Sequence, residues 1–371
     1  MSVYYDNARA EVKEYFRILE PEFPEWLNDY IDTREMLKQQ YISTTCGIIY
    51  TKLFAVDFFY SSLDHSVAVA LIVWHFTHDK KQTLAGLFHD IATPAFKHCI
   101  DFMNGDYLKQ ESTEELTSKF IAESPEIRKF LKRDGIKVSE VDNYHIYPIA
   151  DNDTPKLSAD RLEYSLAQGL FSYKKSDLAK VRRIYRDITV LEDADGVSEL
   201  GFRTPKIAEE FVALTSRLSV IYRNDEARYS EQLLADILKK LSAVGKIKVE
   251  DLYRMKESEV MDLIAWSRYG EAFSNWRAAS EIRTAAEKPE GVYAVNIAAK
   301  VRYIDPLVAV SGELSGADEV AEKGADAGAV EISEKQGSRR ISEVCEAAAK
   351  NIRENLAYDM NRWVYLDGVE V

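Results

Sequence analysis

A histidine and an aspartate stand side by side, as His89 and Asp90, in the mostly apolar stretch LAGLFHDIATPAFKHCIDF of residues 84–102. Burying two such polar groups costs free energy unless a partner satisfies them. That partner is either a structural hydrogen bond or a metal ion. The metal alternative would give these residues a chemical role, because a bound divalent ion makes water more acidic.

Two further polar residues lie in comparable apolar stretches. His65 opens HSVAVALIVWHF, and Asp160 lies near the start of SADRLEYSLAQGL. If the three stretches are helices that pack together, two imidazoles and two carboxylates converge on one point. That ligand set suits a divalent Fe, Mn, Ni, Zn or Mg ion. Any one of these residues alone fits an ordinary buried polar group, but together they favour a metal site formed by His65, His89, Asp90 and Asp160.

Helical periodicity dominates the chain around these residues. Apolar residues at helical spacing predict helices over residues 25–42, 65–76, 83–92, 158–170, 205–244 and 249–270. Residues 113–136 predict two helices separated at Ser124-Pro125, the second ended by Gly135. Ser158 is the expected N-cap of the helix that carries Asp160. These helices must bring the candidate ligands together.

The C-terminal region follows a different pattern. Alternating apolar, aromatic and β-branched residues predict strands over residues 291–310 and 362–371, with the latter as a partner strand. Residues 311–340 are rich in Gly, Ala, Ser and acidic residues and are expected to form a surface loop. The expected fold class is therefore mostly α, a multi-helix bundle with a small C-terminal β element.

Four parts of the chain are expected, because 371 residues are many for a single core. They are an N-terminal helical segment at 1–45, a metal-binding helical core at 46–175, a helical extension at 176–288, and a C-terminal α+β region at 289–371 that contains the acidic loop 311–340.

Composition limits the partners. Hydrophobic residues make up 46% and charged residues 30%, as in ordinary globular proteins, and the net charge is −14. This acidity argues against broad binding to nucleic acid or anionic membranes, but leaves room for a local basic pocket for phosphate. Three scattered cysteines indicate no disulfide framework, the N-terminus is not typical of a signal peptide, and the longest apolar run, 67–74, is too short to span a bilayer. A reducing cytoplasm is the expected location.

The candidate ligands, in this order, resemble the H…HD…D signature of the HD superfamily of metal-dependent phosphohydrolases. LDHSVAVALI resembles the EHS helix start of that family, and LFHDIATPAFKH resembles the HD-containing stretch of its deoxynucleoside triphosphate triphosphohydrolase branch. SADRLEYSLA, LSVIYRNDEARYSEQLLADIL, KVEDLYRMKESEVMDLI and KVRYIDPLV resemble later elements of that branch. The resemblance runs from about residue 35 to 308, and the metal motif is its specific part.

The resemblance implies an HD-domain helical bundle, a divalent metal ion and a role for each matching residue. His65, His89, Asp90 and Asp160 match the metal ligands. The residues that match catalytic positions are His98 and Glu111 for proton transfer, and Arg161 for the phosphate. Those that match substrate-binding positions are Gln110, Tyr164, Tyr222 and Arg223, with Tyr164 against the sugar. The resemblance also implies a small phosphorylated substrate, such as a nucleotide, and is compatible with a homo-oligomer.

Several positions depart from the family pattern. A histidine expected before Glu111 is Gln110, which cannot donate a proton as an imidazolium does. A second histidine expected after the HD pair is Thr93, and an arginine expected before the first metal histidine is Ser62. The Arg-Asp pair expected after the tyrosine is Ala167-Gln168. The metal and scaffold are therefore retained, while the substrate and the reaction are altered.

We expect a metal-dependent phosphohydrolase that acts on a nucleotide or another small phosphorylated compound. The alternatives are a catalytically altered HD-domain protein that binds metal and ligand for a regulatory role, and a helical interaction module with structural histidines. His75 and His78 are expected at a solvated helix end. Two interpretations of His145 remain. It is an ordinary loop histidine, or it lines the pocket, because its segment leads to Asp160.

Overall fold

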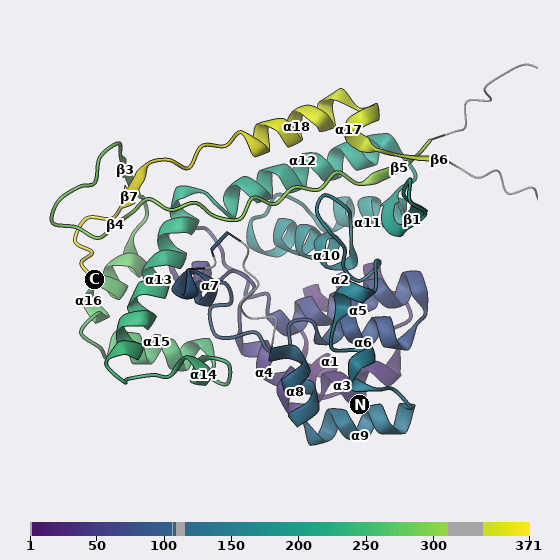
Figure 1. Cartoon of the computed structure of the whole chain (residues 1–371), viewed down its shortest axis with the longest axis horizontal. Coiled ribbons are helices and arrows are strands. Elements are labelled where there is room, and N and C mark those ends of the chain that lie inside the picture. Colours follow the sequence, from purple (N-terminus) through teal and green to yellow (C-terminus); the bar gives the residue numbers. More distant parts are fainter. Residues whose placement is uncertain (1, 106, 109–115, 311–336) are drawn as a thin grey trace, which may run out of the picture.

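The computed structural model describes residues 2–105, 107–108, 116–310 and 337–371, and most of its regular structure is helical (Figure 1). The longer helices of the first half are α2 (Ala10–Leu19), α5 (Ser62–Thr77), α6 (Lys80–Phe88), α9 (Pro125–Asp134) and α10 (Ala159–Ala167). Those of the second half are α11 (Leu178–Asp187), α12 (Pro205–Ile221), α13 (Asp225–Ala243), α15 (Glu257–Ala265), α16 (Gly270–Ala278) and α18 (Glu346–Leu356). The shorter helices are α1 (Val3–Asn7), α3 (Asn28–Ile31), α4 (Arg34–Lys38), α7 (Cys99–Asn104), α8 (Thr117–Glu123), α14 (Val249–Leu252) and α17 (Ile341–Val344). A mostly α fold is thus confirmed.

The central helix is α5, which is buried on nearly every side over its first three turns. Ser61 begins it with a capping box, because its side chain accepts from the Asp64 N–H and the Asp64 side chain accepts from the Ser61 N–H. Helix α6 packs along α5 closely, since a Cβ on Gly86 would lie 3.3 Å from both Val69 and Val73. The predicted helix over 65–76 is confirmed.

The predicted helix over residues 83–92 is wrong at its C-terminal end. Helix α6 ends at Phe88, and the chain continues through tight turns in which the N–H of Ile91 and that of Thr93 each bond a carbonyl three residues back. Pro94 follows, which disfavours a helical conformation for the residue before it. His89 and Asp90 therefore lie just beyond a helix rather than within one.

The other helix predictions are confirmed at their caps and breaks, but three of the predicted helices differ in extent or continuity. The break before Pro125 and the left-handed Gly135 at the end of α9 are confirmed, and so is the N-cap of α10 at Ser158. The predicted helix over 25–42 is interrupted by Thr33, whose backbone is extended. The predicted helix over 158–170 is α-helical only to Ala167 and ends in a π-helical turn, Gln168–Ser172. The predicted helix over 205–244 is two helices, α12 and α13.

Two large hydrophobic clusters and a small third one, formed by Phe102, Ala235 and Ala299, make up the interior of the described part of the chain. The first gathers α2, α5, α6, α10, α11 and α12, and α18 packs onto it by lying alongside α12 (Figure 1). The second gathers α7, α13, α15 and α16 with the last residues of the chain. Val364, Leu366 and Val369 therefore belong to the interior.

Two small sheets complete the fold. One has the order β1 (Ile188–Glu192), β2 (Ser198–Phe202), β5 (Leu307–Val310), β6 (Gly337–Arg340), and the other β3 (Arg283–Ala285), β7 (Trp363–Tyr365), β4 (Ala294–Val295). The pairing of β7 with β4 confirms that residues 362–371 contain a partner strand, although only parts of 291–310 are strand. The loop prediction for 311–340 is wrong at 337–340, which form β6, and its remaining residues 311–336 lie outside the described part. The β1–β2 hairpin was not predicted.

In the described part of the chain, no helix is both long enough and apolar enough to cross a membrane. The division of the chain at residues 45, 175 and 288 stays a prediction.

Candidate metal centre

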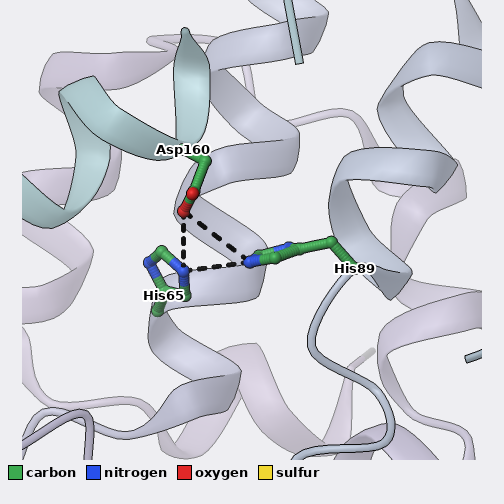
Figure 2. Close-up of side chains that lie close together, drawn as sticks. All are labelled: His65, His89 and Asp160. Carbon is green, nitrogen blue, oxygen red and sulfur yellow. Dashed lines mark hydrogen bonds and ion pairs between the residues drawn. The ribbon is translucent and has the colours of Figure 1, made fainter. Parts of the chain in front are cut away.

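Three of the predicted ligands meet at one point. The Nε2 atoms of His65 and His89 are 3.1 Å apart, and Asp160 Oδ1 lies 3.2 Å from the first and 3.8 Å from the second. Figure 2 shows the three side chains pointing toward one another from separate segments of the chain. The side chains of both histidines are nearly buried, at 6% and 5% exposed, whereas that of Asp160 is 20% exposed. The group is thus open to solvent on the side of Asp160.

Each of these side chains is positioned by a local feature. His65 lies in the first turn and a half of α5, behind the capping box of Ser61. Asp160 lies in the first turn of α10, where Ser158 accepts from the Arg161 N–H. His89 directly follows α6, and its Nδ1 is 2.7 Å from the carbonyl oxygen of Gly86. This hydrogen bond keeps the proton of His89 on Nδ1 and makes Nε2 the metal-binding nitrogen.

Glu163, one turn after Asp160 on α10, orients His65. Its side chain has no exposed surface and its carboxylate contacts His65 Nδ1, so that Nε2 of His65 is also the outward nitrogen. The same carboxylate accepts hydrogen bonds from the hydroxyls of Tyr60, at 2.7 Å, and Tyr15, at 3.3 Å. Burial lowers the pKa of His65, but Glu163 and Asp160 outweigh it and raise that pKa to about 10.

Asp90 stands next to the group rather than within it. Its Oδ2 is 3.9 Å from His65 Nε2 and 3.8 Å from His89 Nε2, and accepts from Lys97 Nζ at 2.6 Å. Burial raises the pKa of the Asp90 carboxyl, but Lys97, His89 and His65 outweigh burial and hold it well below its usual range. Asp90 is therefore a carboxylate paired with Lys97. It lies close enough to His65 and His89 to serve as a fourth ligand of the same ion.

The donor set fits a divalent ion. Two imidazole nitrogens and one carboxylate oxygen lie within 4.8 Å of one another, and ligands about 2.1 Å from a common ion are themselves about 3 Å apart. The ionisation of Asp160 also fits, and an ion at His65 would take the place of a proton that its raised pKa retains at neutral pH. Burial works against ionisation of Asp160, but His65 and His89 outweigh it and hold the pKa of Asp160 at about 2, so its carboxylate is charged at neutral pH. His65, His89 and Asp160 can thus hold a metal ion, with Asp90 beside them.

A cavity of about 690 Å³ opens from this group, within the range of small-molecule sites. Tyr60 of the first hydrophobic cluster and Cys46 of the second both line it, so it lies where the two clusters meet. Four basic side chains line the same cavity: Lys97, Arg161, Lys300 and Arg302. Six acidic side chains line it as well, namely Asp90, Asp151, Asp153, Asp160, Glu163 and Glu231, so the cavity carries charges of both signs. The local basic pocket expected for a phosphate stays a prediction.

Most of the other predicted residues lie at this cavity. His98 lines it, with Nδ1 2.8 Å from the fully buried carboxylate of Asp101. Arg161 lines it and donates to Asn152 Oδ1 at 2.6 Å. Tyr164 and Tyr222 line it with their ring centroids 6.3 Å apart. Gln110 and Glu111 lie outside the described residues.

Arg223 does not lie at the cavity, contrary to its prediction as a substrate-binding residue. It has no exposed surface and donates to Ser219 Oγ at 2.7 Å and to Asn355 Oδ1 at 2.8 Å. These bonds join α12 to α18. Its neighbour Tyr222, in the same turn after α12, lines the cavity.

Several residues of the site were not predicted from the sequence. Glu163 and Lys97 carried a weak signal, as charged residues within apolar stretches near the ligands. Lys300 and Arg302 carried no local signal that distinguishes them from surface residues, because they reach the cavity only through the tertiary fold. His145 lines the cavity, as one of the two interpretations of its segment expected.

Comparison with known proteins places the fold and leaves the activity open. No protein-family model matches the chain. The uncharacterized protein YdhJ of Bacillus subtilis is 23% identical over 264 residues, which are 70% of this chain and 78% of that protein. The fold is similar to that of a hypothetical protein from Aquifex aeolicus, with a TM-score of 0.59 and 14% identity over 93% of each chain. It is also similar to a phosphohydrolase from Bacteroides thetaiotaomicron, with a TM-score of 0.55 and 11% identity over 96% of this chain and 95% of that one.

Proposed function

We propose that the protein is a metal-dependent phosphohydrolase of the HD type, acting on a nucleotide or another small phosphorylated compound. One observation carries the proposal: two imidazoles and a carboxylate converge at the wall of a cavity that four basic side chains also line. The similarity in fold to a solved phosphohydrolase supports it.

The chain supplies ligands for the ion and charge for the phosphate. His65, His89 and Asp160 would hold a divalent ion, which supplies positive charge for a phosphoryl oxygen and makes water more acidic. Lys97 and Arg161 stand in the same cavity. Fixed positive groups at this place stabilise the charge that develops on the phosphoryl oxygens during attack.

His98 is the proposed proton acceptor for the attacking water. The carboxylate of Asp101 at Nδ1 orients the imidazole and stabilises its protonated form, which is the arrangement that a general base needs. Glu111, the other predicted acid–base residue, stays a prediction because it lies outside the described residues.

The rest of the cavity suits a nucleoside. Tyr164, Tyr173 and Tyr222 all line it, and a sugar or base packs well against aromatic surfaces. Tyr164 against the sugar and Tyr222 against the base form the proposed arrangement. Gln110 stays a predicted substrate contact.

Metal analysis and a hydrolysis screen on one sample test the proposal. Native protein loaded with Mn, Ni, Co or Mg is expected to bind close to one ion per chain and to release phosphate or triphosphate from at least one nucleotide. His89→Ala and Asp160→Ala are expected to lose both the bound metal and the turnover, because each removes a ligand atom.

His75→Gln is the matched control. His75 also pairs through Nδ1 with a carboxylate, Glu20 Oε2 at 3.0 Å, but does not line the cavity. It is expected to leave metal and turnover unchanged. Full turnover in His89→Ala would refute the site. Metal bound with no turnover of any phosphoester would favour the alternative, a regulatory HD-type protein that binds metal and ligand.

A further inference from the structure

A second histidine–carboxylate pair lies at the cavity, in addition to His98 and Asp101. The Nδ1 atom of His145 is 2.7 Å from Asp151 Oδ2, and both residues line the cavity that contains the metal-binding group. The two pairs have the same construction, since each histidine meets its carboxylate through Nδ1. They come from different segments, the turn before α7 and the turn before α10.

Asp151 is held in place by the beginning of α10. It is only 6% exposed, its Oδ1 accepts from the hydroxyl of Ser158 at 3.3 Å, and Arg161 Nη1 lies 3.5 Å away. A carboxylate fixed in this way selects the tautomer of His145 with the proton on Nδ1. It also stabilises the imidazolium, and makes Nε2 the nitrogen that exchanges protons.

His145 stands farther out than the metal-binding group. It lies on the 3-10 turn Tyr144–Ile146, where its own N–H donates to Asn143 Oδ1 at 3.0 Å. The ring of Tyr144 separates it from the ligands, with centroids 5.0 Å from His89 and 4.4 Å from His145. The side chain of His145 is half exposed, whereas that of His89 is 5% exposed. A phosphoester with its phosphate at the buried ligands would therefore occupy the cavity that the more exposed His145 also lines.

We infer that His145, oriented by Asp151, is the general acid that protonates the leaving oxygen of the phosphoester. The inference rests on the proposed phosphohydrolase function. His98 takes one proton from water while the water oxygen forms a bond to phosphorus. The bond from phosphorus to the ester oxygen breaks, its electron pair stays on that oxygen, and His145 Nε2–H supplies the proton that yields the alcohol. The products are phosphate and alcohol, and proton exchange with solvent restores both histidines.

The dependence of rate on the leaving group tests this role. An alkyl oxygen, as in a nucleoside 5′-monophosphate, needs a proton to depart, whereas the anion of 2,4-dinitrophenol departs without one. In His145→Gln, the kcat for the nucleotide is expected to fall by roughly 100-fold or more, as general acid catalysis contributes. The kcat for 2,4-dinitrophenyl phosphate is expected to stay within about threefold of native, a change much smaller than the rate enhancement that general acid catalysis provides. Bound metal is expected to be unchanged, and His75→Gln is expected to match native on both substrates.

A measurement without turnover tests the geometry. In ¹⁵N-labelled protein, the Nδ1 signal of His145, assigned by its loss in His145→Gln, is expected to be that of a protonated nitrogen bonded to a carboxylate. Asp151→Asn is expected to shift this signal and to reproduce the selective loss with the nucleotide. A His145 ring that carries no proton on Nδ1 in native protein would overturn the inference.

The outcomes separate this inference from the function on which it rests. Equal losses on both substrates, or none, in His145→Gln would overturn the role of His145 and leave the phosphohydrolase intact. Absence of turnover of every phosphoester by native, metal-loaded protein would overturn the phosphohydrolase and the inference with it.

Discussion

Glu163 is the residue on which the orientation of the metal-binding group depends. It is fully buried, and its carboxylate takes contacts from His65 and from the hydroxyls of Tyr15 and Tyr60. Three donors around one carboxylate compensate for its burial, as a buried charge requires. Carboxylates behind metal-bound histidines fix the ring and raise its basicity.

Glu163→Gln is expected to weaken metal binding by about 10- to 100-fold, the range known for groups behind metal ligands. The amide keeps the shape of the side chain, but offers one acceptor atom in place of two and directs an N–H group at donors. Equilibrium metal titration measures the change. His75→Gln serves again as the control, and metal affinity within twofold of native in Glu163→Gln would contradict the orienting role.

Glu231 is a carboxyl group whose ionisation is disfavoured by its burial at the cavity. It lies on α13, lines the cavity and is 7% exposed, and no hydrogen bond or ion pair reaches it from the described part of the chain. Burial raises the pKa of Glu231 to about 8, with Arg302 opposing the rise and Asp101 adding to it. The folded protein therefore keeps this group protonated at a pH where the unfolded chain has released the proton.

This difference makes stability fall as pH rises. Below the ordinary glutamate pKa, about 4.3, both states are protonated, and between there and about 8 only the folded state retains the proton. Glu231→Gln removes the titration, so its melting temperature is expected to gain a few degrees on native between pH 5 and pH 8.5. Thermal denaturation across that range measures it. Glu250→Gln, at an exposed glutamate, is the control, and a difference from native that does not vary with pH would contradict the assignment.

At the scale of elements, the beginning of α10 brings much of the site together. Within its first turn and a half, α10 carries Asp160, Arg161 and Glu163, and the cap residue Ser158 also bonds Asp151. One helix terminus therefore positions a candidate metal ligand, the arginine proposed to bind phosphate, the partner of His65 and the partner of His145. Displacement of this turn would disturb all four together.

Ser158→Ala is expected to reduce the free energy of unfolding by about 1 kcal/mol, the usual cost of a lost N-cap, and to weaken metal binding measurably. Ser124→Ala is a matched control, because Ser124 also caps a helix and also donates to a carboxylate, Glu35 Oε2 at 2.7 Å, away from the cavity. Denaturant unfolding and metal titration of both variants provide the comparison. Equal loss of metal affinity in the two would show that α10 has no special role.

At the scale of the whole molecule, the C-terminal region is fastened to the core beside α10. Arg340 of β6 forms a two-pronged ion pair with Glu199 of β2, with distances of 2.7 and 2.8 Å, and Glu199 is 1% exposed. Glu199 Oε1 also accepts from the N–H of Leu157, next to the cap of α10, at 3.4 Å. The sheet formed from distant parts of the chain thus contacts the segment that positions the site.

Arg340→Met is expected to reduce the free energy of unfolding by about 3 kcal/mol or more, because it leaves the charge of Glu199 buried without a partner. Arg339→Met is the control. Arg339 pairs with Glu343 on the surface, where such a pair contributes about 0.5 kcal/mol. Adding Glu199→Gln to Arg340→Met is expected to recover most of the loss. Equal, small effects of Arg340→Met and Arg339→Met in denaturant unfolding would contradict the buried role of the pair.

The sequence by itself determined the helical class, the capping of α10 at Ser158, the end of α9 at Gly135 and three residues that come together as a candidate metal site. Those features follow from local physics, namely the spacing of apolar residues, the hydrogen bonds of helix caps and the free-energy cost of burying His or Asp without a partner. Each cap and helix end is encoded within about a dozen consecutive residues, whereas the three candidate ligands were recognised only when separate stretches were considered together.

Only the tertiary structure decided which charged groups meet at the cavity. It paired Asp90 with Lys97 and brought His145 to Asp151. It also directed Arg223 away from the cavity, where it donates to Asn355. It also formed β1, β2 and β6. These outcomes depend on packing between segments that are distant in the chain, and on turns whose side chains have several alternatives of similar free energy. No local pattern selects among such alternatives, whereas the contacts made by the folded chain do.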